Sequence, residues 1–150
     1  MNSPDKRRVK RIRHNEKLSV LIIDGRLSNL IEYQKLSFSS NLDINFADNW
    51  EKGWEMFQNE EVEGNIFDFV VADIDLKAEI ISKSLRDFEK KNSVKPCFLL
   101  GICNDMNSQK KESFLQMSFD SVESIVTEGL LKEIINSLTE VRKTQESIKI

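Results

Sequence analysis

The sequence is poor in residues that build zinc centres and disulfide bonds. It has one histidine and two cysteines, Cys97 and Cys103. Zinc sites need several such ligands at characteristic spacings, so we expect no zinc centre. The two cysteines fall in one predicted strand and its exit loop, where neighbouring positions give poor disulfide geometry. We therefore predict reduced thiols, as in a cytosolic protein.

Long apolar segments are also missing. No run approaches the roughly 18–20 apolar residues that span a bilayer. The basic N-terminus is not followed by the apolar segment of a secretory signal. With 150 residues, 39% hydrophobic and 31% charged, the chain is typical of one soluble domain with a substantial core.

The net charge of −3 is unevenly distributed. Residues 1–17 have a balance of +5, from seven basic and two acidic residues, whereas residues 18–150 have a balance of −8. Apolar periodicity is absent from the first 17 residues. We therefore expect a basic flexible arm at 1–17, a folded domain at 18–143 and a C-terminal tail at 144–150.

Three roles remain open for the basic arm. It could be a solvated tail or linker, or it could contact an anionic partner such as nucleic acid or a membrane surface. In a eukaryotic cell, the basic clusters at 6–8 and 10–11 have the composition of a nuclear address, which would add the nucleus to an otherwise cytoplasmic location. No aromatic residue interleaves the charges, which argues against binding of single-stranded nucleic acid.

Strand and helix patterns alternate along the rest of the chain. Apolar segments predict strands at 18–23, 43–47, 67–76, 96–102 and 121–126. Helical periodicity follows each of them, at 26–40, 48–62, 78–91, 107–117 and 127–143. Strict alternation favours a doubly wound parallel sheet of the flavodoxin-like α/β class, with strand order 2-1-3-4-5.

Local signals refine two of these helices. Leu27, Leu30, Ile31 and Leu36 recur at mostly helical spacing in the first, which Ser28 or Asn29 would cap. In the second, Asp48 and Glu51 have the spacing of a capping box. Its aromatic residues at positions 50, 54 and 57 share one face, which predicts core packing.

Acidic residues end two of the predicted strands. Asp24 follows the first strand, Asp73 ends the third, and Asp75 lies two residues further on. The predicted order places these two strands side by side, so Asp24 and Asp73 would meet at the carboxyl edge of the sheet. Two carboxylates at that edge are close enough to share a cation.

These segments resemble a known family. Residues 20–24, 67–76 and 96–100, in a five-fold strand–helix frame, are similar to the receiver domains of response regulators and hybrid histidine kinases over about residues 18–140. The resemblance implies that Asp73 accepts a phosphoryl group from a phosphohistidine on a sensor histidine kinase or phosphotransfer protein. It implies a signalling module rather than an enzyme, with no small-molecule substrate.

Three positions depart from the family pattern. The second metal-binding acid of strand 1 is replaced by Gly25. The hydroxyl residue that ends strand 4 is replaced by Gly101, or by Ile102 if the register slips by one. The lysine of strand 5 is replaced by Ile125. Metal binding, charge stabilisation and switching would each lose a group, so we expect weak Mg²⁺ binding and impaired chemistry.

Two main hypotheses follow. In the first, the chain is an atypical receiver-like interaction module, in which Asp73 is a vestigial acid bound to a following helix and Asp24 caps a helix. In the second, it is a single-domain response regulator that holds Mg²⁺ through Asp24, Asp73 and a main-chain carbonyl. Asp75 would then either add an oxygen or remain a turn residue.

Two further expectations concern binding. By resemblance, residues 108–141 form the surface that receivers use for partners or homodimers. A flavodoxin-like small-molecule binder is a third reading of the same fold. It would need a phosphate-binding loop after the first strand, and residues 25–28 (Gly-Arg-Leu-Ser) contain too little Gly, Ser and Thr for that role.

Overall fold

The computed structural model describes residues 17–37, 41–74, 77–105 and 107–149. Its strands are β1 (Leu18–Ile23), β2 (Leu42–Ala47), β3 (Phe69–Asp73), β4 (Phe98–Ile102) and β5 (Ser121–Glu123). Its helices are α2 (Leu27–Leu36), α3 (Trp50–Val62), α4 (Ala78–Lys91), α5 (Ser108–Gln116) and α6 (Glu128–Lys149). Most of the basic arm and Asp75 lie outside the described residues, so the predictions for them are not addressed by the structure.

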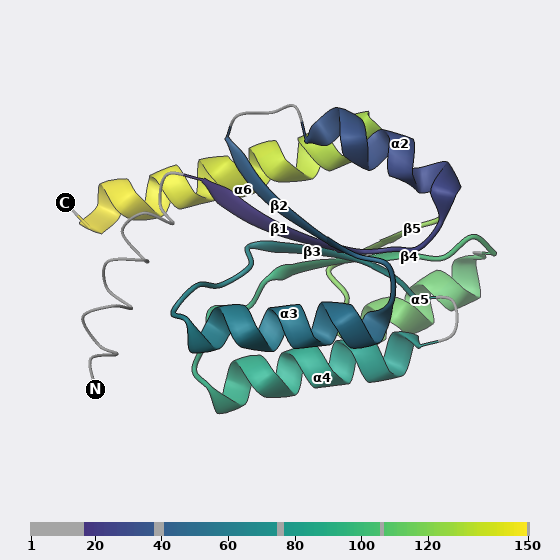
Figure 1. Ribbon diagram of the computed structural model, residues 1–150, viewed down its shortest axis with the longest axis horizontal. Coiled ribbons are helices and arrows are strands. Elements are labelled where there is room, and N and C mark those ends of the chain that lie inside the picture. The colour runs from purple at the N-terminus through teal and green to yellow at the C-terminus, as the bar shows by residue number, and fades with distance from the viewer. Residues whose placement is uncertain (1–16, 38–40, 75–76, 106, 150) are drawn as a thin grey trace.

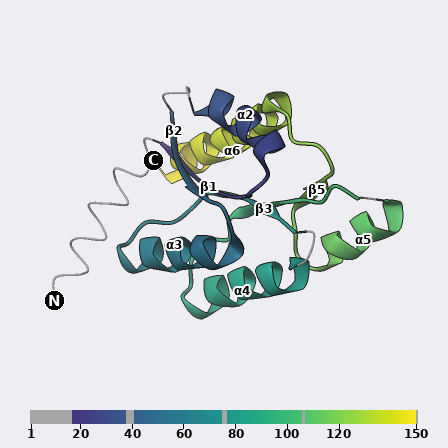
Figure 2. The same ribbon diagram turned by 45° about the vertical axis from the view of Figure 1, so that its right-hand side comes forward.

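The five strands form one parallel sheet in the order β2-β1-β3-β4-β5. This confirms the predicted flavodoxin-like class. Helices α2 and α6 cover one face of the sheet, while α3, α4 and α5 cover the other (Figures 1 and 2). None of the helices in the described ranges is both long and apolar enough to cross a bilayer.

The central strands have continuous apolar sequences because both faces of the sheet are covered. All six residues of β1 are buried, as are the first four of β3. Alternate residues serve opposite cores: Leu21 and Val70 pack towards α3 and α4, whereas Val20 and Val71 pack towards α2 and α6. Each fully buried aliphatic side chain stabilises the fold by roughly 1.5–3 kcal/mol.

Several element ends differ from the sequence prediction. Strand β5 ends at Glu123, so Ile125 lies in the following loop rather than in the strand. Helix α2 ends at Leu36, and α6 continues to Lys149, beyond its predicted end near residue 143. Cys97 and Cys103 are buried, and they are not joined in a disulfide bond, as predicted.

Both predicted caps are wrong. Asn49 rather than Asp48 caps α3, because its Oδ1 accepts the backbone N–H of Lys52 at 2.9 Å. At α2, neither Ser28 nor Asn29 is the cap; the N-cap is Arg26, which makes no capping bond through its side chain. The start of α2 is held by Asp24 instead, as described below.

Only part of the apolar set that the periodicity of α2 indicates faces the core: Leu36 is buried, but Leu27 and Ile31 are not. Leu27 is 80% exposed and Ile31 is 58% exposed, whereas Tyr33 and Leu36 are buried. The tyrosine turns inward because its hydroxyl donates a hydrogen bond to Asp24. The helix therefore presents a row of apolar side chains to solvent.

Helix α3 follows the prediction more closely. Trp50 is buried and stacks on the partly buried Trp54, with ring centroids 5.4 Å apart. Phe57 continues this aromatic row into the core. Helix α5 is capped by Asn107, whose Oδ1 accepts the backbone N–H of Lys110 at 2.9 Å.

Candidate functional site

Asp24 and Asp73 meet at the carboxyl edge of the sheet. Strands β1 and β3 are hydrogen-bonded neighbours, with Ile23 in register with Ala72, so the residues that follow them emerge side by side. Both acids line one cavity of about 290 Å³, which is bounded by Ile23, Asp24, Gly25, Asp48, Asn49, Trp50, Asp73 and Lys77. The topology thus brings together the two acids that the sequence singled out.

The carboxylate of Asp24 is engaged by the start of α2. Its Oδ1 accepts the backbone N–H of Arg26 at 2.9 Å. Its Oδ2 accepts from Asn29 Nδ2 at 2.8 Å and from Tyr33 Oη at 2.7 Å. Burial, followed by the charge of Asp24, raises the pKa of the Tyr33 hydroxyl, so this donor keeps its proton. Asp24 therefore anchors the first turn of α2.

The carboxylate of Asp73 forms an ion pair with Arg26. Arg26 Nη2 lies 2.9 Å from Asp73 Oδ1, and the two side chains are 17% and 28% exposed. A charge-assisted bond of this length is stronger than a neutral one. No local pattern in the sequence marks Arg26, because its partner lies 47 positions away and the two meet only through the pairing of β1 with β3.

The donor set does not fit a preformed Mg²⁺ site. Mg²⁺ needs near-octahedral oxygen ligands, but both oxygens of Asp24 already accept protein donors and Asp73 faces a guanidinium. Within the described ranges there is no group of three or more acidic, histidine or cysteine side chains placed to hold a metal. We therefore derive no step through a metal ion at this site.

Gly25 allows a close backbone approach. An added Cβ at this position would lie 2.7 Å from the carbonyl oxygen of Asp48. The loop is held there because Asp24 N–H donates to the carbonyl of Ala47 at 3.0 Å. The position of the family's second acid is therefore sterically closed as well as lacking a carboxylate.

Gly101 is crowded by side chains rather than by backbone. Its strand register pairs it with Ala72, and Asp73 with Ile102, so neither candidate position offers a hydroxyl. A Cβ on Gly101 would lie 2.7 Å from Ile74 Cδ1 and 3.1 Å from the ring of Phe119. Apolar atoms occupy the space that the Cβ of a serine or threonine would need.

Neither Gly101 nor Ile125 lines the cavity at Asp73. Ile125 is 71% exposed in the loop between β5 and α6. Lys77 does line the cavity, but its ammonium forms an ion pair with Glu51. Arg26 is thus the cation that the described structure places against Asp73.

A groove of about 400 Å³ adjoins this cavity and shares Asp24, Gly25 and Asp48 with it. Its other lining residues come from α2, β2, α3 and the loops between them: Arg26, Leu27, Leu30, Phe46, Ala47, Lys52 and Met56. Phe46 is partly exposed at 44%. The exposed apolar row of α2 therefore continues into a hollow beside the two acids.

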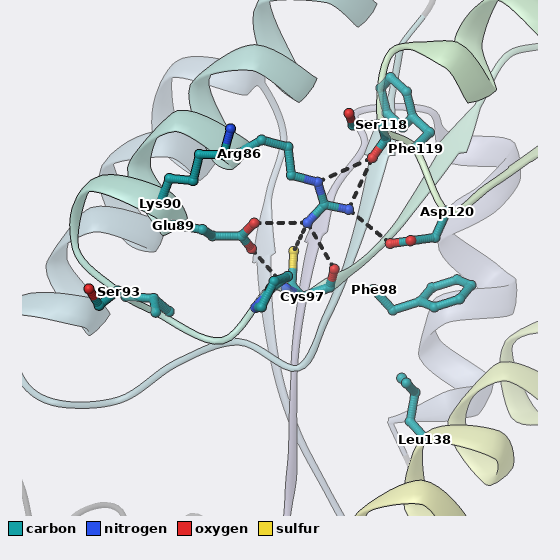
Figure 3. Close-up of a pocket in the computed structure, with 12 residues that line it drawn as sticks. Arg86, Glu89, Lys90, Ser93, Cys97, Phe98, Ser118, Phe119, Asp120 and Leu138 are labelled. Carbon is teal, nitrogen blue, oxygen red and sulfur yellow. Dashed lines mark hydrogen bonds and ion pairs between the residues drawn. The ribbon is translucent and has the colours of Figure 1, made fainter.

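A second cavity, of about 700 Å³, lies at another part of the molecule and is bordered by an internal ion network (Figure 3). Arg86 donates to Glu89, to Asp120 and to the carbonyls of Cys97 and Ser118. Glu89 is 3% exposed and also accepts the N–H of Cys97. These side chains bind one another and connect α4 to β4 and to the loop before β5, which is a structural role.

The one thiol in this network, Cys97, is unreactive. Burial, followed by the charge of Glu89, raises the pKa of the Cys97 thiol well above its ordinary value, so it is a poor nucleophile. Burial alone would lower the pKa of Arg86, but the hydrogen bond to Glu89 and the neighbouring charges raise it. The guanidinium of Arg86 is therefore held in its charged form by its acidic neighbours.

Neither a protein-family model nor a curated protein sequence matches this chain. Solved structures do match, and they define the fold as that of receiver domains. The signal receiver domain of a LuxO repressor protein from Vibrio parahaemolyticus has a TM-score of 0.67 and 13% identity, covering 89% of this chain and 98% of that one.

Two further structures agree. A response regulator from Thermotoga maritima has a TM-score of 0.64 and 10% identity, over 83% of this chain and 98% of its own. A pilus assembly-related protein from Burkholderia pseudomallei has a TM-score of 0.61 and 9% identity, over 84% and 92%. At such identities the likeness concerns the fold, and the chemistry has to be argued from the site.

Proposed function

We propose that this chain is an atypical receiver-like domain of two-component or phosphorelay signalling that acts mainly by protein–protein recognition, with impaired phosphoacceptor chemistry. The supporting observation is that donors from the start of α2 engage both acids: Asp24 accepts three hydrogen bonds and Asp73 is paired with Arg26. The acid at the phosphoacceptor position is therefore present, but the carboxylates of the site are bound by protein donors.

The chemistry argues in the same direction. Transfer of a phosphoryl group to a carboxylate requires stabilisation of the charge on the equatorial phosphoryl oxygens. The family supplies it with a metal ion, a hydroxyl and a lysine, and the corresponding positions here are Gly25, Gly101 and the solvent-exposed Ile125. An acceptor without these groups should react slowly.

The partner that we propose is a sensor histidine kinase or a phosphotransfer protein in the cytoplasm. The exposed apolar side chains of Leu27 and Ile31 lie on α2, beside the groove that adjoins Asp73. Exposed apolar surface of this kind marks sites of protein contact. The second surface, residues 108–141, includes α5, which buries none of its side chains and exposes Leu115; we propose it for homodimers.

The second candidate function is a single-domain response regulator that completes the transfer to Asp73. It is favoured by the 28% exposure of the Asp73 side chain at the mouth of the cavity, where a phosphoryl donor can reach it. In this candidate, the exposed apolar side chains of α2 serve only to dock the phosphoryl donor. It differs from the first in one measurable property, the rate of Asp73 modification.

The test is incubation with acetyl phosphate, or with beryllofluoride, in the presence of Mg²⁺. Intact mass spectrometry would detect a phosphoryl group and amide NMR shifts would detect beryllofluoride. We expect little or no modification of the wild-type chain. Modification that is stoichiometric and absent from Asp73→Asn would replace the first proposal with the second.

A further inference from the structure

We propose that Arg26 is the resident cation of the Asp73 site: its guanidinium takes the charge role of a divalent ion and excludes Mg²⁺ from the two carboxylates. This inference rests on the proposed function and deepens it, because it names the residue that sets the metal response of the site.

The first step of the argument is that Arg26 bridges the two acids. Its backbone N–H donates to Asp24 Oδ1 at 2.9 Å, and its Nη2 donates to Asp73 Oδ1 at 2.9 Å. A shared divalent ion would have to connect the same two carboxylates. One residue therefore already makes, with its main chain and its side chain, the link that a metal would make.

The second step is that the bridge is held in place. Arg26 is the N-cap of α2, and its carbonyl accepts the N–H of Asn29 at 3.1 Å. Its side chain is only 17% exposed. The backbone of Arg26 is thus fixed by Asp24 and by the helix, and the guanidinium reaches Asp73 from this fixed point.

The third step is the cost of admitting a metal. Mg²⁺ would need oxygens of Asp24 that now accept from Asn29 and Tyr33, and Tyr33 is buried. A dication at Asp73 would also lie within a few ångströms of the guanidinium, which repels it. The other cation that lines the cavity, Lys77, is paired with Glu51 and does not have this role.

The experiment is a Mg²⁺ titration of the full chain, measured by isothermal titration calorimetry. We expect the wild type to show little saturable binding. Arg26→Gln should gain affinity by about ten- to a hundredfold, because it removes both the repulsion and the ion pair. Arg26→Lys keeps the charge and should stay close to the wild type.

The matched control is Lys77→Gln, which removes one positive charge from the same cavity without breaking the Asp73 ion pair. It should change the Mg²⁺ affinity by less than about threefold. An affinity of Arg26→Gln equal to that of the wild type, or an equal gain in Lys77→Gln, would overturn the inference.

A measurement on the wild type keeps the test independent of any variant that folds poorly. Paramagnetic Mn²⁺, which prefers the same oxygen ligands as Mg²⁺, should cause no localised broadening of the amide resonances of Asp24, Arg26 and Asp73. Selective broadening of these three resonances would contradict the inference.

The two proposals fail separately. The metal titrations use no phosphoryl donor, and phosphorylation of Asp73 is read by mass. A wild-type chain that is readily phosphorylated but binds no Mg²⁺ would refute the impaired chemistry and leave the role of Arg26 intact. A chain that binds Mg²⁺ but resists phosphorylation would do the reverse.

Discussion

Glu32 of α2 accepts, through its Oε1, the backbone N–H of Glu128 at the first position of α6, at 2.8 Å and across 96 residues of sequence. This bond joins the two helices that cover one face of the sheet (Figure 2). It also satisfies one of the N–H groups that a helix start leaves without an intrahelical partner. The helix dipole favours a negative charge at this position.

The Glu32 bond predicts a pH-dependent contribution to stability. The backbone hydrogen bond from Glu128, followed by the one from Lys35, lowers the pKa of Glu32 from its ordinary value of 4.5. A depressed pKa means that the charged form stabilises the fold above about pH 4.5, and that the contribution disappears as the pH falls through the lowered value. Glu32→Gln should therefore be less stable than the wild type near neutral pH.

Urea denaturation of both proteins at about pH 7 and about pH 3 checks this sign. The difference in unfolding free energy should shrink at the acidic pH, where the wild-type carboxyl is also neutral. Lys35→Gln, which removes the other hydrogen-bond donor to Glu32, should give a smaller loss. A difference that grows on acidification would contradict the assignment.

Tyr33 should not ionise while the protein is folded. It is the chain's single tyrosine, so its ultraviolet absorbance reports it directly. Burial and the charge of Asp24 raise its pKa above the ordinary value of 10.0, so the neutral hydroxyl stabilises the fold and that contribution is lost as the pH rises beyond the unfolded value. Tyrosinate absorbance should appear together with alkaline unfolding, as seen by circular dichroism.

Tyr33→Phe removes the hydroxyl that donates to Asp24. A hydrogen bond to a charged group contributes about 1.5–3 kcal/mol, and we expect a loss of that size in urea denaturation. A change below about 0.5 kcal/mol would show that Asp24 is held by Arg26 and Asn29 alone.

Gly25→Ala should destabilise the fold by about 1–3 kcal/mol, because its Cβ would meet the carbonyl oxygen of Asp48. Gly129→Ala is the matched control: its Cβ has only an ordinary contact, at 3.9 Å from Thr127 Oγ1, and alanine is the better helix former in α6. Thermal unfolding should show the two variants moving in opposite directions. Equal melting temperatures would mean that the loop at Asp48 shifts to admit the Cβ at little cost in free energy.

Gly101→Ser places a hydroxyl near the end of β4 and should cost about 1–3 kcal/mol through crowding against Ile74 and Phe119. Ile74→Val removes the Cδ1 atom that stands closest. In the double variant part of the loss should be recovered, measured as a coupling energy in a double-mutant cycle. Additive losses would show that the crowding is relieved elsewhere.

Arg86→Met should cost roughly 3–5 kcal/mol, because it leaves the buried carboxylate of Glu89 without its charge partner. The control is Lys132→Met, which breaks the exposed pair with Glu128 and should cost about 0.5 kcal/mol or less. Urea denaturation distinguishes the two. Equal losses of unfolding free energy would contradict a structural role for the network in Figure 3.

The fold was predictable because burial dominates it. Strands β1 and β3 are covered on both faces, so their sequences carry no polar alternation, and Val20 and Val70 have no exposed surface. The same rule located Asp24 and Asp73, since a polar residue at the end of such a run lies at the sheet edge. Alternation with helices then predicts a parallel sheet, and the strand order is that of the flavodoxin-like class.

What escaped prediction depends on tertiary contacts. The cap of α3 moved by one residue to Asn49, and the face of α2 turned because Tyr33 bonds to Asp24. Arg26 carried no local signal, since an arginine two residues after an acid is common and its partner is remote in sequence. Such pairings become visible only when the register of β1 against β3 is known.

The contact between Gly25 and Asp48 also limits the mutational routes by which a second acid could arise beside Asp24. A single substitution of Gly25 by aspartate introduces the clash with the Asp48 carbonyl before the new carboxylate can serve as a ligand. The loop between β2 and α3 has to shift to admit the new side chain, so this change becomes easier after a substitution at or near residues 48–49 that lets the loop move. A library selected for Mg²⁺ binding should therefore accumulate loop substitutions before it recovers an acid at position 25.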